Sequence, residues 1–208
     1  MLRKSVALTG ILVLGSLLSQ YACGQNPQHD NFENDIVVAA LGRTQQDVRY
    51  DGSYFSMPYP NGDVPPNIGV CTDVIIRAYR AIGTDLQKLV HEDMSANFSA
   101  YPSTRLWGLR STDANIDHRR VPNLQMFFSR HGEILPVTLQ KKDYAPGDLV
   151  TWMLPGNLPH IGIVTGKLSA STGTSLIVHN IGAGPNLDDM LFTYPITGHY
   201  RFVPENYP

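Results

Sequence analysis

A single cysteine stands at the start of a predicted helix, in the stretch GVCTDVIIRAYR. The chain has two cysteines, Cys23 and Cys71, and seven histidines. A thiol acts as a nucleophile when a base takes its proton and a third group orients that base. The free N–H groups at a helix N-terminus favour the thiolate, so we expect a lowered pKa for Cys71. Cys71 is therefore the candidate nucleophile, and the alternative is a buried, inert thiol.

Two histidines lie on predicted strands, in the runs HIGIVTG and SLIVHNIG. Because alternate residues of a strand share a face, His160 points to the same side as Gly162, and His179 to the same side as Ile177. Neighbouring strands would present both rings to the end of the helix, with His160 as the base and His179 as the residue that orients it. A shift of one residue in the register would put Asn180 in the place of His179.

Further side chains are candidates for contact with a substrate. Asp73, in the first turn of the helix, favours the helix but opposes a nearby thiolate. His118 and Arg119 belong to the segment NIDHRR, where an arginine could bind carboxylates of a peptide; a solvated turn explains the same pattern. Trp152 is a candidate for a cleft wall, although aromatic residues are more often in the core. Asn180 is a further candidate.

Metal chemistry is a weaker interpretation of the same histidines. His118, His160, His179 and an aspartate could bind zinc, but the sequence has no tight ligand spacing such as HExxH. We therefore expect no metal and no other cofactor. The net charge of −2 and the 16% of charged residues also argue against a nucleic-acid-binding protein.

The elements that must position these residues form two groups along the chain. Apolar periodicity predicts a helix that ends near Gly42, a helix over 72–82, a helix that starts at Thr84, and a helix over 123–130 that ends at Gly132. After Gly132, the runs GDLVTWML, HIGIVTG, SLIVHNIG and HYRFVP predict consecutive antiparallel strands. Helices followed by a sheet indicate an α+β fold.

The N-terminus has the pattern of a secretory signal peptide. Basic Arg3 and Lys4 precede an uncharged, mostly apolar run over 6–18, and small residues follow at 22–24. We therefore expect a signal peptide over 1–24, a polar linker over 25–34, and one domain over 35–208 that is exported to the periplasm as a monomer. Cys23 could instead carry a lipid anchor, but Gln20 stands where a lipoprotein signal has an aliphatic residue.

The motifs together resemble known families. GVCTDVIIRAYR, PGDLVTW and HIGIVTG are similar to the NlpC/P60 branch of papain-like cysteine peptidases, although Val70 stands where that family usually has an aspartate. With NIDHRRVPNL, IVHNIG and ITGHYRF added, the set resembles the bacterial domain-of-unknown-function family 1287, which is grouped with NlpC/P60-like folds. The second resemblance covers nearly all of the chain from about Asp35.

The resemblance implies a papain-like fold in which N-terminal helices pack on a C-terminal antiparallel sheet. It also implies a cysteine hydrolase that cuts an amide bond in peptidoglycan peptides with Cys71, His160 and His179. Related folds also transfer acyl groups. The alternative is a non-catalytic protein of the same fold that binds the cell wall or acts as a scaffold.

Overall fold

The computed structural model describes residues 27–207, so the expected signal peptide over 1–24 lies outside the described residues. The helices are α1 Pro27–Arg43, α2 Cys71–Ala81, α3 Leu86–Asn97, α4 Ser103–Trp107 and α5 Val121–His131, with short 3-10 turns η1 Phe98–Ala100, η2 Asp117–Arg119 and η3 Lys141–Asp143. The strands are β1 Arg49–Tyr50, β2 Ile68–Gly69, β3 Glu133–Ile134, β4 Leu149–Leu154, β5 Leu158–Leu168, β6 Ser175–Asn180, β7 Pro185–Asp188 and β8 Ile196–Arg201. Within this range no helix combines the length and the apolar character that a membrane crossing requires.

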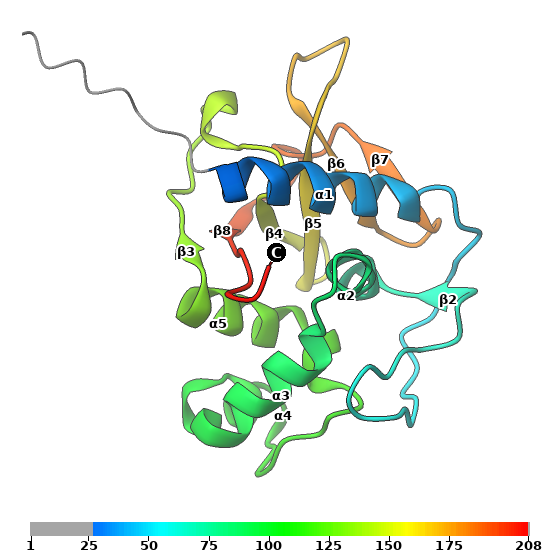
Figure 1. Cartoon of the computed structure of the whole chain (residues 1–208), viewed down its shortest axis with the longest axis vertical. Helices are drawn as coiled ribbons and strands as arrows, with labels where there is room; N and C mark the ends of the chain where they lie inside the picture. The colour runs from blue at the N-terminus through cyan, green and yellow to red at the C-terminus, as the bar shows by residue number, and fades with distance from the viewer. Residues whose placement is uncertain (1–26, 208) are drawn as a thin grey trace, which may run out of the picture.

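The main sheet has six strands in the order β3-β8-β4-β5-β6-β7, and each neighbouring pair is antiparallel. The mixed architecture therefore has helices first and an antiparallel sheet after them, as the sequence predicts. The helices α1, α2 and α5 all contact β5, the long central strand (Figure 1). One face of the sheet is thus covered by helices.

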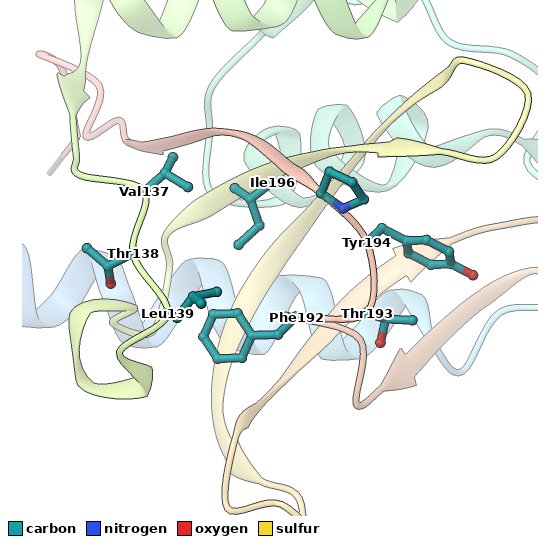
Figure 2. A pocket seen from close by; sticks show the side chains of 8 residues that line it. Val137, Thr138, Leu139, Phe192, Thr193, Tyr194 and Ile196 are labelled. Carbon is teal, nitrogen blue, oxygen red and sulfur yellow. The ribbon is translucent and has the colours of Figure 1, made fainter.

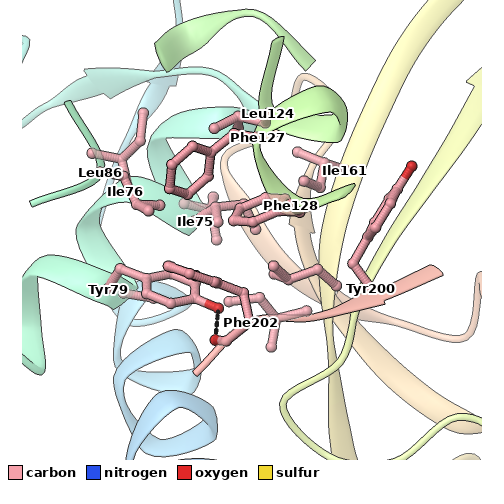
Figure 3. Packing of buried hydrophobic residues seen from close by; sticks show 14 of the residues in the cluster. Ile75, Ile76, Tyr79, Leu86, Leu124, Phe127, Phe128, Ile161, Tyr200 and Phe202 are labelled. Carbon is pink, nitrogen blue, oxygen red and sulfur yellow. Dashed lines mark hydrogen bonds between the residues drawn. The ribbon is translucent and has the colours of Figure 1, made fainter. Parts of the chain in front are cut away.

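The main core lies between these helices and the sheet. Residues Ile161 and Ile163 of β5 and Val178 of β6 point into it, as the alternation of side chains on a strand requires. From α2, Ile75 and Tyr79 fill the centre, and the Tyr79 hydroxyl donates a hydrogen bond of 2.8 Å to the carbonyl of Phe202 (Figure 3). Periodic apolar residues thus fix which side of α2 faces the sheet.

A second cluster lies on the opposite face of the sheet, and it includes Trp152, Val164 and Ile177. Beside it the buried carboxylate of Asp148 binds His199 at 2.9 Å and Arg201 at 2.8 Å. Asp148 is the acid of the PGD motif, so this part of the motif holds β8 to the start of β4. His199, for which the sequence motifs indicate no role, therefore has a structural one.

Three local features differ from the sequence-based expectations. Residues 27–34, expected to lie in the linker, form the first turns of α1, and Phe32 is buried in the core because its ring packs against Tyr79 and Tyr207. Helix α3 is capped by Asp85 rather than Thr84, since the Asp85 carboxylate accepts the N–H of Gln87. The short strands β3 and β7 extend the sheet on both sides.

Candidate active site

Cys71 is the first residue of α2, and Val70 is its N-cap. Valine has no side-chain oxygen to cap a helix. Asp73, the third residue of the helix, instead accepts the backbone N–H of Val70 with its carboxylate, at 2.7 Å. The start of α2, and with it the position of the sulfur, is therefore fixed by a side chain two residues after Cys71.

The segment that leads into Cys71 is held by Arg77, six residues further along α2. Its guanidinium bonds both carboxylate oxygens of Asp63, at 3.0 and 3.2 Å, and donates to the carbonyls of Val64, Pro65 and Ile68. The planar fork of an arginine suits such a multiple contact. Residues 63–68 are thus bound to the helix that carries the thiol.

The Asp73 carboxylate also forms a bidentate ion pair with Arg119, with both N···O distances at 2.9 Å. The two side chains are 4% and 2% exposed. Arg119 further donates to the carbonyls of Ser53 and Asp51, and its own carbonyl accepts the hydroxyl of Thr72. Asp73 and Arg119 are therefore bound to each other, and this pair ties η2 and residues 51–53 to the start of α2.

Burial raises the pKa of the Cys71 thiol to about 12, and the nearby Asp73 carboxylate adds to the rise. The backbone N–H groups of Ile161, Thr72 and Cys71 itself act in the opposite direction. The expectation of a lowered pKa is therefore wrong, because at 5% exposure the loss of hydration outweighs the helix N-terminus. The resting thiol is protonated at neutral pH.

The two candidate histidines meet. Nε2 of His160 lies 3.0 Å from Nδ1 of His179, and the two rings are perpendicular. Nε2 of His179 lies 3.0 Å from a carboxylate oxygen of Asp188, at the end of β7. The result is a continuous hydrogen-bonded row from β5 through β6 to the outer strand of the sheet.

The two residues on either side of His160 in the sequence, Pro159 and Ile161, both lie near the Cys71 thiol. The N–H of Ile161 faces the sulfur, and Pro159 lines the same cavity as Cys71. No hydrogen bond joins the Cys71 sulfur to His160 within residues 27–207. The structure therefore places the backbone of β5 beside the thiol, whereas the ring of His160 packs 6.0 Å from the ring of Trp152 and makes no direct bond to the sulfur.

Both rings favour the neutral form. Burial lowers the pKa of His160 to about 3, and the neighbouring His179 lowers it further. Burial also lowers the pKa of His179, while Asp188 partly opposes that change. A neutral imidazole can accept a proton, so His160 is in the state that a general base needs at neutral pH.

Cys71 lines a cavity of about 260 Å³ between the start of α2, η2, the start of α5 and the first residues of β5. The charged residues of its wall are Arg119 and Arg120, and its exposed aromatic residues are Tyr50 and Trp107. The guanidinium of Arg120 lies 4.4 Å from the centre of the Trp107 ring, a cation–π distance. A substrate in this cavity would meet a thiol, a cation and an aromatic ring.

Comparison with known sequences agrees with the motifs. Residues 37–202 match the family described as domain of unknown function (DUF1287). The chain belongs to the DUF1287 family. The DUF1287 chain is also 52% identical over 172 residues to the protein of Escherichia coli (strain K12) called uncharacterized protein YijF, a match that covers 81% of this chain and 82% of that one.

The other residues singled out in the sequence of this DUF1287 protein lie in different places. His118 is buried and does not line the cavity. Trp152 is buried in the second cluster, and its indole N–H donates to the carbonyl of Leu191, so we correct its assignment as a cleft wall. Asn180 donates to the carbonyl of Gly69, near Cys71, and does not replace His179 beside His160.

A larger cavity of about 510 Å³ lies between residues 137–139 and the segment 192–196 that leads into β8 (Figure 2). Its walls are largely apolar, with Leu139, Phe192 and Ile196 among them, and none of the candidate site residues lines it. Volume alone does not make it an active site, because it lacks a nucleophile and a base. In the described part of the DUF1287 chain, no group of three or more histidine, cysteine or acidic side chains is arranged to hold a metal ion.

Sequence reasoning missed Asp188 and Trp107, whereas Arg120 lines the cavity as the segment NIDHRR suggested. Asp188 ends a four-residue strand that the sequence pattern did not predict, in the stretch NLDD. Trp107 ends the short helix α4 and lies outside every motif. The sequence signal that could have located Asp188 is its place in the acidic pair of NLDD, shortly after the run SLIVHN.

Proposed function

We propose that this chain is an exported cysteine hydrolase that cleaves an amide bond in peptidoglycan peptides. The observation that carries the proposal is the hydrogen bond between His160 and His179, which engages Nε2 of His160 on the strand whose Ile161 N–H faces the Cys71 sulfur. A nucleophile, a base and an orienting group are the three parts that such a reaction needs.

The proposed reaction starts from a neutral thiol and a neutral imidazole. As the Cys71 sulfur attacks the carbonyl carbon, its proton moves to Nδ1 of His160, and the backbone N–H of Cys71 is a donor for the oxyanion. His160 then gives the proton to the leaving amine as the C–N bond breaks. Water, deprotonated by His160, attacks the thioester and releases the acid and the thiol.

The substrate class rests on the resemblance to NlpC/P60 peptidases and on the sequence pattern of residues 1–24. An exported enzyme meets the peptides of the cell wall directly. Arg120 in the cavity would suit a substrate that carries a carboxylate.

A second candidate function is a non-catalytic wall-binding protein of the same fold. The buried thiol with a raised pKa favours it, because an unused cysteine is commonly buried and inert. Under this function the residues of the cavity bind a wall peptide, and Cys71 only fills space.

The test is digestion of purified wall peptides by the wild type, Cys71→Ala, His160→Gln and His131→Gln, with products identified by mass spectrometry. His131 is an exposed control on α5, paired with Asp93. We expect cleavage by the wild type and His131→Gln only. Equal products from the wild type and Cys71→Ala would reject the proposed nucleophile. Binding of intact wall by both proteins, with no cleavage by either, would favour the second function.

A further inference from the structure

Asp188 ends the row of hydrogen bonds that begins at His160. In the register of β6 and β7 it lies opposite Ile177, whose side chain shares a face with that of His179. The aspartate therefore reaches His179 diagonally across the strand pair, at 3.0 Å. Its side chain is 51% exposed, so it is a charged group at the solvent side of an otherwise buried row.

The chemistry of the carboxylate determines where each proton lies. An ionised carboxylate only accepts hydrogen bonds, so Nε2 of His179 must carry a hydrogen. In a neutral His179 the other nitrogen, Nδ1, then has a lone pair and must accept. Nε2 of His160 must therefore donate to it, which leaves the lone pair of neutral His160 at Nδ1.

That lone pair is the one that the proposed function requires as the base. Nδ1 of His160 makes no hydrogen bond with any residue in the range 27–207, whereas Nε2 is engaged by His179. We propose that Asp188 is a positioning residue that sets the tautomers of His179 and His160, and thereby keeps the basic nitrogen of His160 at Nδ1. The proposal rests on the proposed function for its catalytic consequence, but the tautomers themselves do not depend on any activity.

Without the carboxylate, the hydrogen bonds of the row can run in either of two directions, and each direction satisfies the same groups. An asparagine at position 188 can turn its amide N–H₂ toward Nε2 of His179, which then becomes an acceptor. Every proton in the row then reverses: His179 donates from Nδ1, and His160 accepts at Nε2 and carries its hydrogen at Nδ1. In that arrangement Nδ1 of His160 carries a hydrogen and cannot take the proton of a thiol. Loss of the acid has the same consequence in other triads in which an acid fixes the tautomer of a histidine.

The neighbouring residue provides a matched control. Asp189 is also an exposed aspartate, but its carboxylate accepts the hydroxyl of Thr172 and contacts neither histidine. Asp188→Asn and Asp189→Asn therefore remove the same charge from adjacent positions, and only the first touches the row. Asp188→Glu keeps an acceptor-only group and serves as the conservative variant.

The experiment records the ring nitrogens of ¹⁵N-labelled histidine by NMR in the full chain of the wild type and the three variants, with thermal unfolding as a check of the fold. We expect both His160 and His179 to carry their hydrogen at Nε2 in the wild type, Asp189→Asn and Asp188→Glu. Asp188→Asn should show a hydrogen at Nδ1 of His179 in a large fraction of molecules. Unchanged tautomers in a folded Asp188→Asn would overturn the proposal.

Activity gives a second, separable measurement. For Asp188→Asn we expect kcat on the cleaved peptide to fall about 10- to 100-fold, the usual effect of removing an outer partner of a functional histidine, with KM unchanged. Asp188→Glu should recover much of the loss. Altered tautomers with unchanged kcat would overturn the catalytic part of the proposal. If the wild type cleaves no peptide, the proposed function fails, while the NMR result still decides the role of Asp188.

Discussion

At the scale of single residues, the candidate site combines a buried thiol with a buried imidazole, and burial favours the neutral form of both groups. It raises the pKa of Cys71 to about 12 and lowers that of His160 to about 3, so each group is neutral at pH 7. A preformed thiolate–imidazolium pair is therefore not the resting state. Proton transfer and attack on the substrate would occur together, as they do for a serine nucleophile.

The alkylation of Cys71 tests this description of the thiol. We expect the rate with iodoacetamide in the folded chain to rise with pH along a curve whose apparent pKa lies well above the value of about 8.5 for a free cysteine. The same chain in denaturant provides the reference curve, and Cys71→Ala reports any reaction elsewhere. A folded-state midpoint below the reference would show that the helix N-terminus, and not burial, controls the thiol.

The residue types of the site were readable in the sequence, and their environments were not. The start of a helix placed Cys71, and strand alternation brought His160 and His179 to one face, because both arguments rest on local geometry. The pKa of Cys71 depends on the packing of α2 against β5, where Ile161 approaches the sulfur. Asp188 belongs to a strand that is defined by its pairing with β6 rather than by its own residues.

At the scale of elements, the pairing of β5 with β6 sets the position of His179, and Gly162 makes that pairing close. A Cβ at position 162 would lie 2.5 Å from a methyl carbon of Ile177, 3.0 Å from the carbonyl of Val178 and 3.2 Å from the Cβ of His179. Cβ contacts below 3.0 Å force a neighbour to move. The glycine of HIGIV is therefore a spatial requirement of the histidine pair.

Gly162→Ala should lower the thermal stability and displace His179 from His160. Overpacking of a core by one methyl group costs about 1–3 kcal/mol of unfolding free energy. Gly166→Ala, later in the same strand, is the matched control, because its added Cβ would meet only Pro146 at 3.5 Å. Chemical denaturation measures both costs, and an equal cost for the two variants would contradict the steric argument.

The ion pair between Asp73 and Arg119 joins η2 to α2, and we expect its disruption to be asymmetric. Arg119→Met leaves a buried carboxylate without a cation and should cost about 3–5 kcal/mol, whereas the double variant with Asp73→Asn should recover part of that loss. The double-mutant cycle in urea gives the coupling energy between the two residues. An additive cycle would mean that the carboxylate is satisfied by the Val70 N–H alone.

At the scale of the whole molecule, buried neutral histidines link folding to pH. Burial lowers the pKa of His118 to about 3, as it does for His160, whereas a histidine in the unfolded chain titrates near 6.5. Between these values the unfolded chain holds protons that the folded chain does not. The stabilising effect of the neutral rings is therefore complete above about pH 6.5 and is lost as the pH falls toward 3.

We expect the unfolding free energy to fall from pH 7 to pH 4 with a slope that approaches about 1.4 kcal/mol per pH unit for each of the two histidines. Urea denaturation at a series of pH values measures the slope. His118→Gln and His160→Gln should each reduce it, and His179, whose pKa is also lowered by burial, should account for part of the remainder. A wild-type slope near zero between pH 6 and pH 4 would contradict the burial of neutral rings.

The whole-molecule architecture was predictable in its order of helices and strands, because each element has its own periodicity. The two ends of the described chain were not predictable, since their contacts are with each other. The hydroxyl of Tyr207 donates to the Asp35 carboxylate at 2.7 Å, and its ring meets the ring of Phe32 edge to face. Nothing in the polar segment around Phe32 indicated a buried aromatic residue.

This contact at the two ends matters for how the molecule can be shortened. The residues that match the family run from 37 to 202, yet Phe32, which packs against Tyr79, and Tyr207, which packs against Phe32, both lie outside them. A fragment trimmed to the matched residues would expose the Tyr79 ring and lose two large aromatic side chains, each of which typically contributes about 3–5 kcal/mol when buried. The folding unit is therefore longer at both ends than the stretch by which its relatives are recognised.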